Sequence, residues 1–111
     1  MLSDRYITFC AFDGDAVVGE IMLIPELNES RLIIDSFHVS REFRRCGIGR
    51  RLVETVSDYA RGRGASALYA SCSSAEETID FYKALGFELS EHPIPSCAED
   101  EPFDIQMECK L

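Results

Sequence analysis

The chain has 111 residues, enough for one hydrophobic core and too few for two domains. Its net charge of −9 at pH 7 repels nucleic acid and anionic membrane surfaces and favours cationic partners. No apolar run approaches the roughly 20 residues of a membrane-spanning helix and the N-terminus lacks a secretory pattern, so we expect one domain, residues 1–111, in the cytoplasm.

The first forty residues predict three strands. They are rich in β-branched and aromatic residues, and Asp13-Gly14 is a strong hairpin turn signal between the first two. Gly19 inside the second strand indicates a bulge or a close approach of another backbone. The predicted strands are residues 5–12, 16–24 and 31–39, with a polar loop at 25–30 and the third strand central to the sheet.

The pattern then changes to a helical period. Ile48, Leu52, Val56 and Ala60 recur every four residues, which predicts an amphipathic helix over residues 47–63 that ends at Gly62 or Gly64. A strand at 66–72 follows. Residues 74–77 match a capping box that begins a second helix, which continues to residue 85 with Gly86 after it.

The C-terminal part predicts a strand at residues 87–90, an acidic, proline-containing loop at 91–102 and an alternating strand at 103–110. The element order is therefore βββαβαββ. This order is typical of an α+β fold, a sheet with helices packed on its faces, in which the strand after the first helix lies parallel to the central strand.

The segment from Arg41 to Arg51 joins the central strand to the first helix and carries five of the eleven basic residues. A helix N-terminus has unpaired N–H groups and a partial positive charge, and it therefore attracts phosphate. Gly47 and Gly49 would let a phosphate approach the backbone closely. The segment lacks the third glycine of a dinucleotide-binding fingerprint and the G-K-[ST] of a Walker A loop.

Two motifs resemble those of GCN5-related N-acetyltransferases (GNAT). Arg44-Arg45-Cys46-Gly47-Ile48-Gly49 resembles the R/Q-x-x-G-x-G/A signature, and residues 78–87 resemble the FY-x-x-x-GF segment about forty residues downstream. Residues 104–107 resemble the final strand. The resemblance covers residues 6–111 and implies the acyl-CoA N-acyltransferase-like fold, with a mixed, mostly antiparallel sheet. It also implies acetyl-CoA as co-substrate and acetyl transfer to a primary amine of a small molecule or peptide.

The resemblance also implies where acetyl-CoA binds. Its pyrophosphate would lie on the loop that begins the first helix, and its pantetheine arm would pair with the central strand. The cofactor-binding residues expected on this basis are Arg44, Arg45, Cys46, Gly47, Ile48, Gly49 and Arg50 in the loop, Phe37 and Val39 in the strand, and Ser74.

The family lets the amine attack the thioester directly, so the enzyme needs a proton acceptor and a proton donor. Tyr82 matches the position of the family's usual general acid, although a core role for its ring is an alternative. Asp35 and Glu20 are the candidate bases, each with a salt-bridged or solvated role as the alternative. In a regular strand, Asp35 shares a face with Phe37 and Val39. His38 points to the opposite face and therefore ranks below the two carboxylates.

The chain departs from the family pattern in two places. Ala75 stands where many members carry a cofactor-contacting asparagine; Ser73 or Ser74 would replace it or simply cap the helix. The strand and two helices that usually precede the first hairpin are not in this sequence, which indicates a fragment, a short form or a homodimer that completes its amine pocket from a second subunit.

A non-catalytic acetyl-CoA-binding module and an interaction domain are the alternative functions. The identity of the amine does not follow from the sequence. The acidic residues 99–101 and Asp104 either lie near the amine site and favour a cationic acceptor or simply face water. The five cysteines include no C-x-x-C pair, so no metal is expected.

Overall fold

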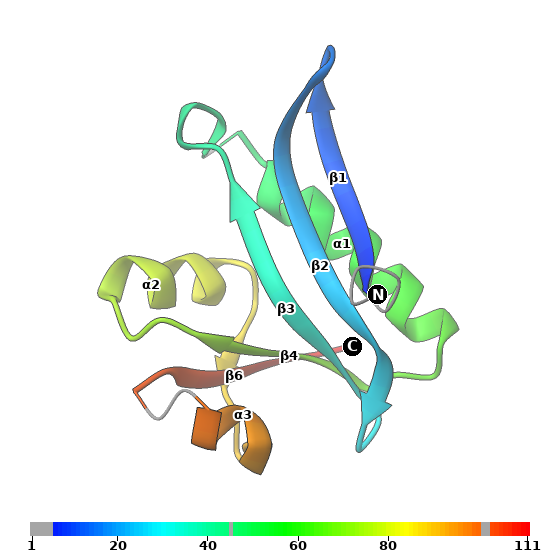
Figure 1. Ribbon diagram of the computed structural model, residues 1–111, viewed down its shortest axis with the longest axis vertical. Coiled ribbons are helices and arrows are strands. Elements are labelled where there is room, and N and C mark those ends of the chain that lie inside the picture. Colours follow the sequence, from blue (N-terminus) through cyan, green and yellow to red (C-terminus); the bar gives the residue numbers. More distant parts are fainter. Residues whose placement is uncertain (1–5, 45, 101–102) are drawn as a thin grey trace.

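The computed structural model describes residues 6–44, 46–100 and 103–111, and six strands of this part form one sheet in the order β1-β2-β3-β4-β6-β5 (Figure 1). Neighbouring strands are antiparallel except for β3 and β4, which are parallel. The expected mixed, mostly antiparallel sheet of an α+β fold is confirmed. The strands are β1 (Ile7–Asp13), β2 (Ala16–Asn28), β3 (Arg31–Val39), β4 (Ala67–Cys72), β5 (Glu88–Leu89) and β6 (Ile105–Lys110).

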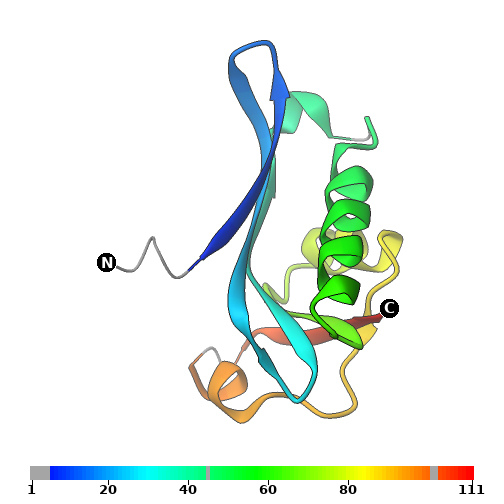
Figure 2. The same ribbon diagram turned by 90° about the vertical axis from the view of Figure 1, so that its right-hand side faces the viewer.

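Helices α1 (Ile48–Gly62) and α2 (Glu76–Ala84) lie on one side of the sheet, and α3 (Pro95–Asp100) lies on the other (Figure 2). A short 3-10 helix, η2 (Arg41–Phe43), lies between β3 and α1. The apolar stripe of α1 predicted from the four-residue spacing is buried, with Leu52, Val56 and Ala60 in the core. Within the described residues, no helix is long and apolar enough to cross a membrane.

Gly19 lets α1 approach β2 closely, as its position inside a strand predicted. A Cβ atom at Gly19 would lie 3.0 Å from Cγ2 of Ile48 and 3.2 Å from Cδ1 of Leu52. Both contacts are shorter than ordinary van der Waals distances. The first turn of α1 is therefore held against the sheet at a separation that a larger residue would not permit.

Two parts of the predicted element pattern are wrong. The predicted loop at 25–30 is mostly strand, because β2 continues through Pro25 to Asn28 and the chain turns at Glu29 and Ser30, whose φ angles are 51° and 64°. The β2–β3 register is irregular between Ile24 and Asn28, so no ladder hydrogen bond from Pro25 is required. The predicted loop at 91–102 contains α3.

The predicted capping box at the start of α2 is also wrong. The N-cap is Ala75, and no side chain makes the capping hydrogen bond. Ser73 Oγ instead accepts a hydrogen bond from the Ala75 N–H at 3.1 Å. At the other helix ends, Gly64 has φ 83° after α1 and Gly86 has φ 100° after α2, which are the left-handed positions that favour glycine.

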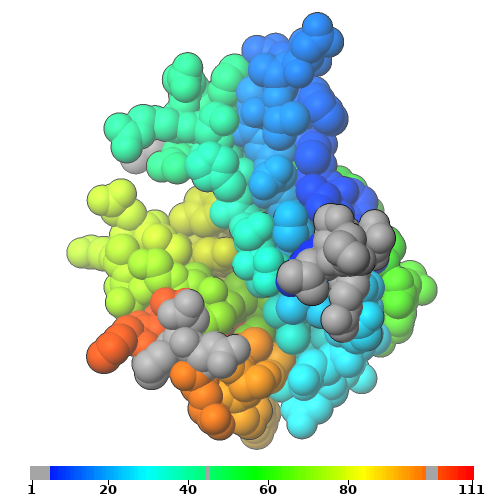
Figure 3. Space-filling view, viewed as in Figure 1, coloured from blue at the N-terminus to red at the C-terminus, as the bar shows by residue number. Residues whose placement is uncertain are grey.

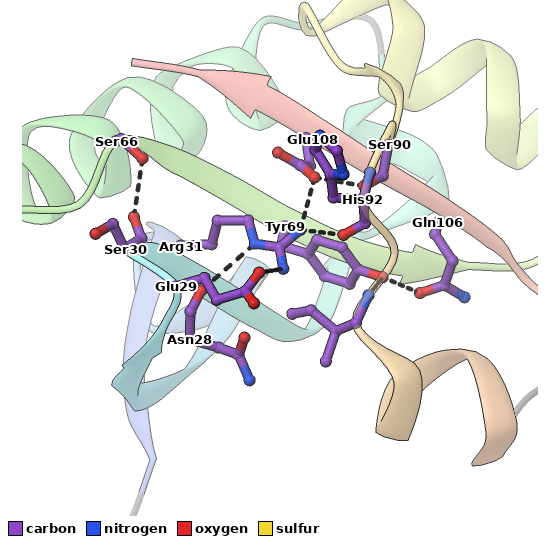
Figure 4. A network of polar contacts seen from close by, with 11 residues as sticks. Asn28, Glu29, Ser30, Arg31, Ser66, Tyr69, Ser90, His92, Gln106 and Glu108 are labelled. Atoms are coloured by element: carbon purple, nitrogen blue, oxygen red, sulfur yellow. Dashed lines mark hydrogen bonds and ion pairs between the residues drawn. The ribbon is translucent and has the colours of Figure 1, made fainter.

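Arg31 is the centre of a polar network on the sheet face that α1 does not cover (Figure 4). Its guanidinium donates to Glu108 Oε2 and Glu29 Oε1, both at 2.8 Å, and to the carbonyl of His92. It also lies over the Tyr69 ring, 5.0 Å from the centroid. Arg31 therefore joins the start of β3 to β6 and to the segment that leads into α3.

We expect the substitution Arg31→Met to destabilise the fold by about 2 kcal/mol, because it leaves the partly buried Glu108 carboxylate without its cation. Urea denaturation of the two proteins measures the difference. The double variant Arg31→Met, Glu108→Leu should recover part of the loss. Wild-type stability of the single variant would show that the network contributes nothing.

Candidate active site

Strands β3 and β4 separate in the middle of the sheet. They pair from Arg31↔Ala67 to Ile34↔Ala70, whereas β3 continues to Val39 with β2 as its only strand partner among the described residues. Figure 1 shows β3 turning away from β4, with α2 beside the gap. The space-filling view shows a hollow on the same side, between the blue-green segment that follows β3 and the yellow-green α2 (Figure 3). The second half of β3 thus has one unpaired edge.

A β-bulge at Asp35 marks the point of separation. Leu23 pairs with Ile34 and Met22 pairs with Ser36, so Asp35 is the extra residue on β3. Ile34 is buried before the bulge and Val39 after it, which shifts the strand's alternation by one residue. The prediction that Asp35 shares a face with Phe37 and Val39 assumed a regular strand and is wrong; Asp35 is exposed.

The main-chain groups of Val39 point to the unpaired edge of β3. The Val39 carbonyl accepts a hydrogen bond from Arg44 Nε at 3.0 Å, while the next residue, Ser40, donates from its N–H to the Val18 carbonyl of β2 at 2.8 Å. Main-chain groups alternate between the two edges of a strand. Those of Phe37 therefore face the same edge as those of Val39.

The first turn of α1 presents unsatisfied donors. Gly47 is the N-cap in the left-handed conformation (φ 83°), and no side chain caps the helix. The first helical hydrogen bond is donated by the Arg51 N–H to Gly47, and within the described residues nothing accepts from the N–H groups of Ile48, Gly49 or Arg50. The first turn also carries no acidic residue. This is the local chemistry of an anion site.

The other residues expected to bind the cofactor differ in their exposure and in the groups they contact. Cys46 is exposed, and Arg45 lies outside the described residues. Arg50 donates to the Ala84 carbonyl at the end of α2 at 3.1 Å. Gly49 lies against Phe81: a Cβ there would be in ordinary contact with the Phe81 ring, at 3.4 Å. Ser74 is exposed and does not cap α2.

Tyr82 points from α2 into an aromatic cluster beside the gap between β3 and β4. Its ring packs edge-on against Phe37, Phe81 and Phe87, at centroid distances of 6.1, 5.5 and 5.2 Å. Burial, with a smaller effect of Cys72, raises the pKa of Tyr82 well above its usual value. No described residue forms a hydrogen bond with the Tyr82 hydroxyl. Every fully buried polar side-chain atom of the described residues has a hydrogen-bond partner, so the Tyr82 hydroxyl is not fully buried and reaches solvent.

The candidate base Glu20 lies on the sheet face opposite α1. Its neighbours Gly19 and Ile21 are buried beneath that helix, and side chains alternate along a strand. Glu20 is half-buried and directly opposite His38 of β3. Asp35 is exposed and Glu20 is half-buried. Tyr82 is buried, and its position fits both the core role and the chemical role considered for it.

Comparison with known proteins identifies the family. Residues 2–87 match the model of the "Acetyltransferase (GNAT) family". The chain belongs to this family. GNAT relatives include the probable N-acetyltransferase camello of Xenopus laevis, which is 32% identical over 97 residues, 86% of this chain and 44% of the relative. N-alpha-acetyltransferase 80 of Mus musculus is 34% identical over 76 residues, 68% of this chain and 23% of the relative. The chain thus spans less than half the length of these GNAT relatives.

Solved GNAT structures share the fold. The aminoglycoside 6′-acetyltransferase type Ii superposes with a TM-score of 0.75 at 25% identity, covering 99% of this chain and 72% of the other. An aminoglycoside 6′-N-acetyltransferase complexed with coenzyme A gives a TM-score of 0.76 at 21% identity, covering 99% and 75%. The sheet and helices described above are therefore those of the GNAT fold.

Cys46 provides a chemical probe of the anion site. It is exposed immediately before the first turn of α1, and Cys10 on β1 is an exposed control. If coenzyme A binds at this turn, saturating coenzyme A should slow the reaction of Cys46 with N-ethylmaleimide and leave Cys10 unaffected, as measured by peptide mass spectrometry. Equal rates at Cys46 with and without coenzyme A would place the ligand elsewhere.

Proposed function

We propose that the protein is an N-acetyltransferase that moves the acetyl group of acetyl-CoA to a primary amine by direct attack. The observation that carries the proposal is the unpaired edge of β3, which runs from the anion site at the start of α1 to the point where β3 and β4 separate. One end can hold phosphate and the other can hold a thioester. Family membership supports the same activity.

In this proposal, acetyl-CoA lies along the edge of β3. The N–H groups of Ile48, Gly49 and Arg50, which have no acceptor among the described residues, bind the pyrophosphate, with Gly47 giving close access. The pantetheine amides pair with main-chain groups of Phe37 and Val39, as an added strand would. The Val39 carbonyl already bonds to Arg44, so cofactor binding there exchanges this partner.

The chemistry needs two proton transfers. The amine nitrogen bonds to the thioester carbon and becomes acidic, its proton passes to a carboxylate, and the C–S bond then breaks. Tyr82 donates its hydroxyl proton to the departing thiolate, and its raised pKa keeps it protonated at neutral pH. Asp35 and Glu20 are the proton acceptors indicated by the sequence, and both lie on the face of the sheet that α1 leaves open.

Thermal unfolding with acetyl-CoA, with free coenzyme A and without ligand tests the binding step. A ligand at roughly 100 times its Kd stabilises by about 2.7 kcal/mol, which raises the Tm of a domain of this size by about 10 °C. Release of coenzyme A in the presence of spermidine, kanamycin or a peptide with a free α-amine, followed by chromatography, tests turnover. Stabilisation without turnover on any amine would identify a non-catalytic binding module instead.

Tyr82→Phe should lower kcat by about 10²-fold, because the ring stays in the aromatic cluster while the proton donor is lost. The Kd for acetyl-CoA should not change. Tyr59→Phe is the control, because it removes a tyrosine hydroxyl that bonds to Arg63 on α1 while the ring packs against Phe9 of β1, outside the candidate site. A wild-type kcat for Tyr82→Phe across pH 6–9 would exclude the acid role.

A further inference from the structure

A series of four hydrogen bonds runs in one direction across the face of β4 and β6 on which α3 lies. The Ile94 N–H donates to Tyr69 Oη at 2.9 Å, and the Tyr69 hydroxyl donates to Gln106 Oε1 (Figure 4). Gln106 Nε2 donates to Ser71 Oγ at 2.9 Å, and the Ser71 hydroxyl donates to Asp104 Oδ2. The amide of Gln106 uses both its acceptor and its donor, so the direction of every bond is fixed.

The series of hydrogen bonds ends at the Asp104 carboxylate, next to the stretch of β4 at which pairing with β3 stops. Ser71 is the first residue of β4 beyond the last β3–β4 pair, Ile34↔Ala70. Asp104 lies immediately before β6, next to Ile105, which pairs with Cys72. The bond from Ser71 is the longest in the series, 3.4 Å, and therefore leaves the half-buried carboxylate able to accept from a stronger donor.

Asp104 and Tyr82 lie on opposite faces of the sheet at this point. Ser71 faces the side on which α3 lies together with Gln106, whereas the neighbouring Cys72 faces the core and Tyr82. Burial first, and then the negative charge of Asp104, raises the pKa of the Cys72 thiol to about 11, and Cys72 in turn affects Tyr82. The carboxylate and the phenol are thus close to the same stretch of β4 from its two sides.

We propose that Asp104 is the proton acceptor of the transfer reaction and that Ser71 is its positioning residue; this inference rests on the proposed function. A thioester at the gap then has a base on one face of the sheet and an acid on the other. The proton leaves the amine nitrogen for Asp104 as the C–N bond forms. The thiolate takes the Tyr82 proton as the C–S bond breaks, and solvent returns both groups to their starting states.

Asp35 and Glu20 lack this support. Neither carboxylate accepts a hydrogen bond within the described residues, so neither is oriented before the amine arrives. Pre-oriented groups contribute more to a transition state than groups that must first be ordered. Asp104 accepts a hydrogen bond from Ser71, and Ser71 is linked through Gln106 to the fully buried Tyr69.

The test compares Asp104→Asn with Asp35→Asn, Glu20→Gln and the surface control Asp15→Asn in the β1–β2 turn. The amine is whichever of spermidine, kanamycin or the free α-amine peptide the wild-type protein acetylates fastest. Asp104→Asn should lower kcat/KM for the amine by about 10²-fold, with the Kd for acetyl-CoA unchanged. Ser71→Ala should lower kcat by a smaller factor, and Ser71→Thr, which keeps the hydroxyl, should restore it.

The outcomes separate this inference from the proposed function. A wild-type kcat/KM for Asp104→Asn, in a protein that acetylates the amine, would overturn the role of Asp104 alone. The role of Asp104 would also be overturned if Asp35→Asn or Glu20→Gln, and not Asp104→Asn, lowered kcat/KM by about 10²-fold. No turnover by the wild-type protein on any of the three amines would overturn the proposed function and the role of Asp104 together.

Discussion

The separation of β3 from β4 is the constraint on which the rest of the structure depends. Parallel pairing stops at Ile34↔Ala70, and the bulge at Asp35 shifts the alternation of β3 at the next residue. The bulge turns Phe37 and Val39 toward the helices and leaves their main-chain groups at an edge with no neighbouring strand. Every candidate group of the site is placed relative to this edge.

The two helices on the core side place the groups at either end of the edge. Gly19 allows the first turn of α1 to lie close to the sheet, which positions its free N–H groups. Phe81 packs against Gly49, and Arg50 bonds to Ala84, so the start of α1 and the body of α2 are joined directly. The location of Tyr82 therefore depends on the same contacts that form the anion site.

Sequence patterns predicted most of the fold, because periodicity and glycine positions report on local structure. The period of Ile48, Leu52 and Val56 predicted α1, and the two motifs around Gly47 and Tyr82 indicated the family.

The bulge at Asp35 was not predicted because it is set by pairing with β2, which no local pattern records. From the sequence, Asp104 either lay near the amine site or faced water. The sequence could not decide between the two, because the hydrogen bond from Ser71 to Asp104 joins residues 33 positions apart. The capping role of Ser74 was wrong because Ala75 takes the N-cap.

An unpaired strand edge is also a site for unwanted association between chains, because its free N–H and C=O groups are a template for a foreign strand. In this protein, the exposed Asp35 stands in the bulge at one end of the edge, and Arg44 covers the Val39 carbonyl at the other. A charged bulge and a capped carbonyl are two of the ways in which proteins discourage β-aggregation. Both features make the edge a poorer template for a foreign strand while its remaining groups stay available to a small molecule.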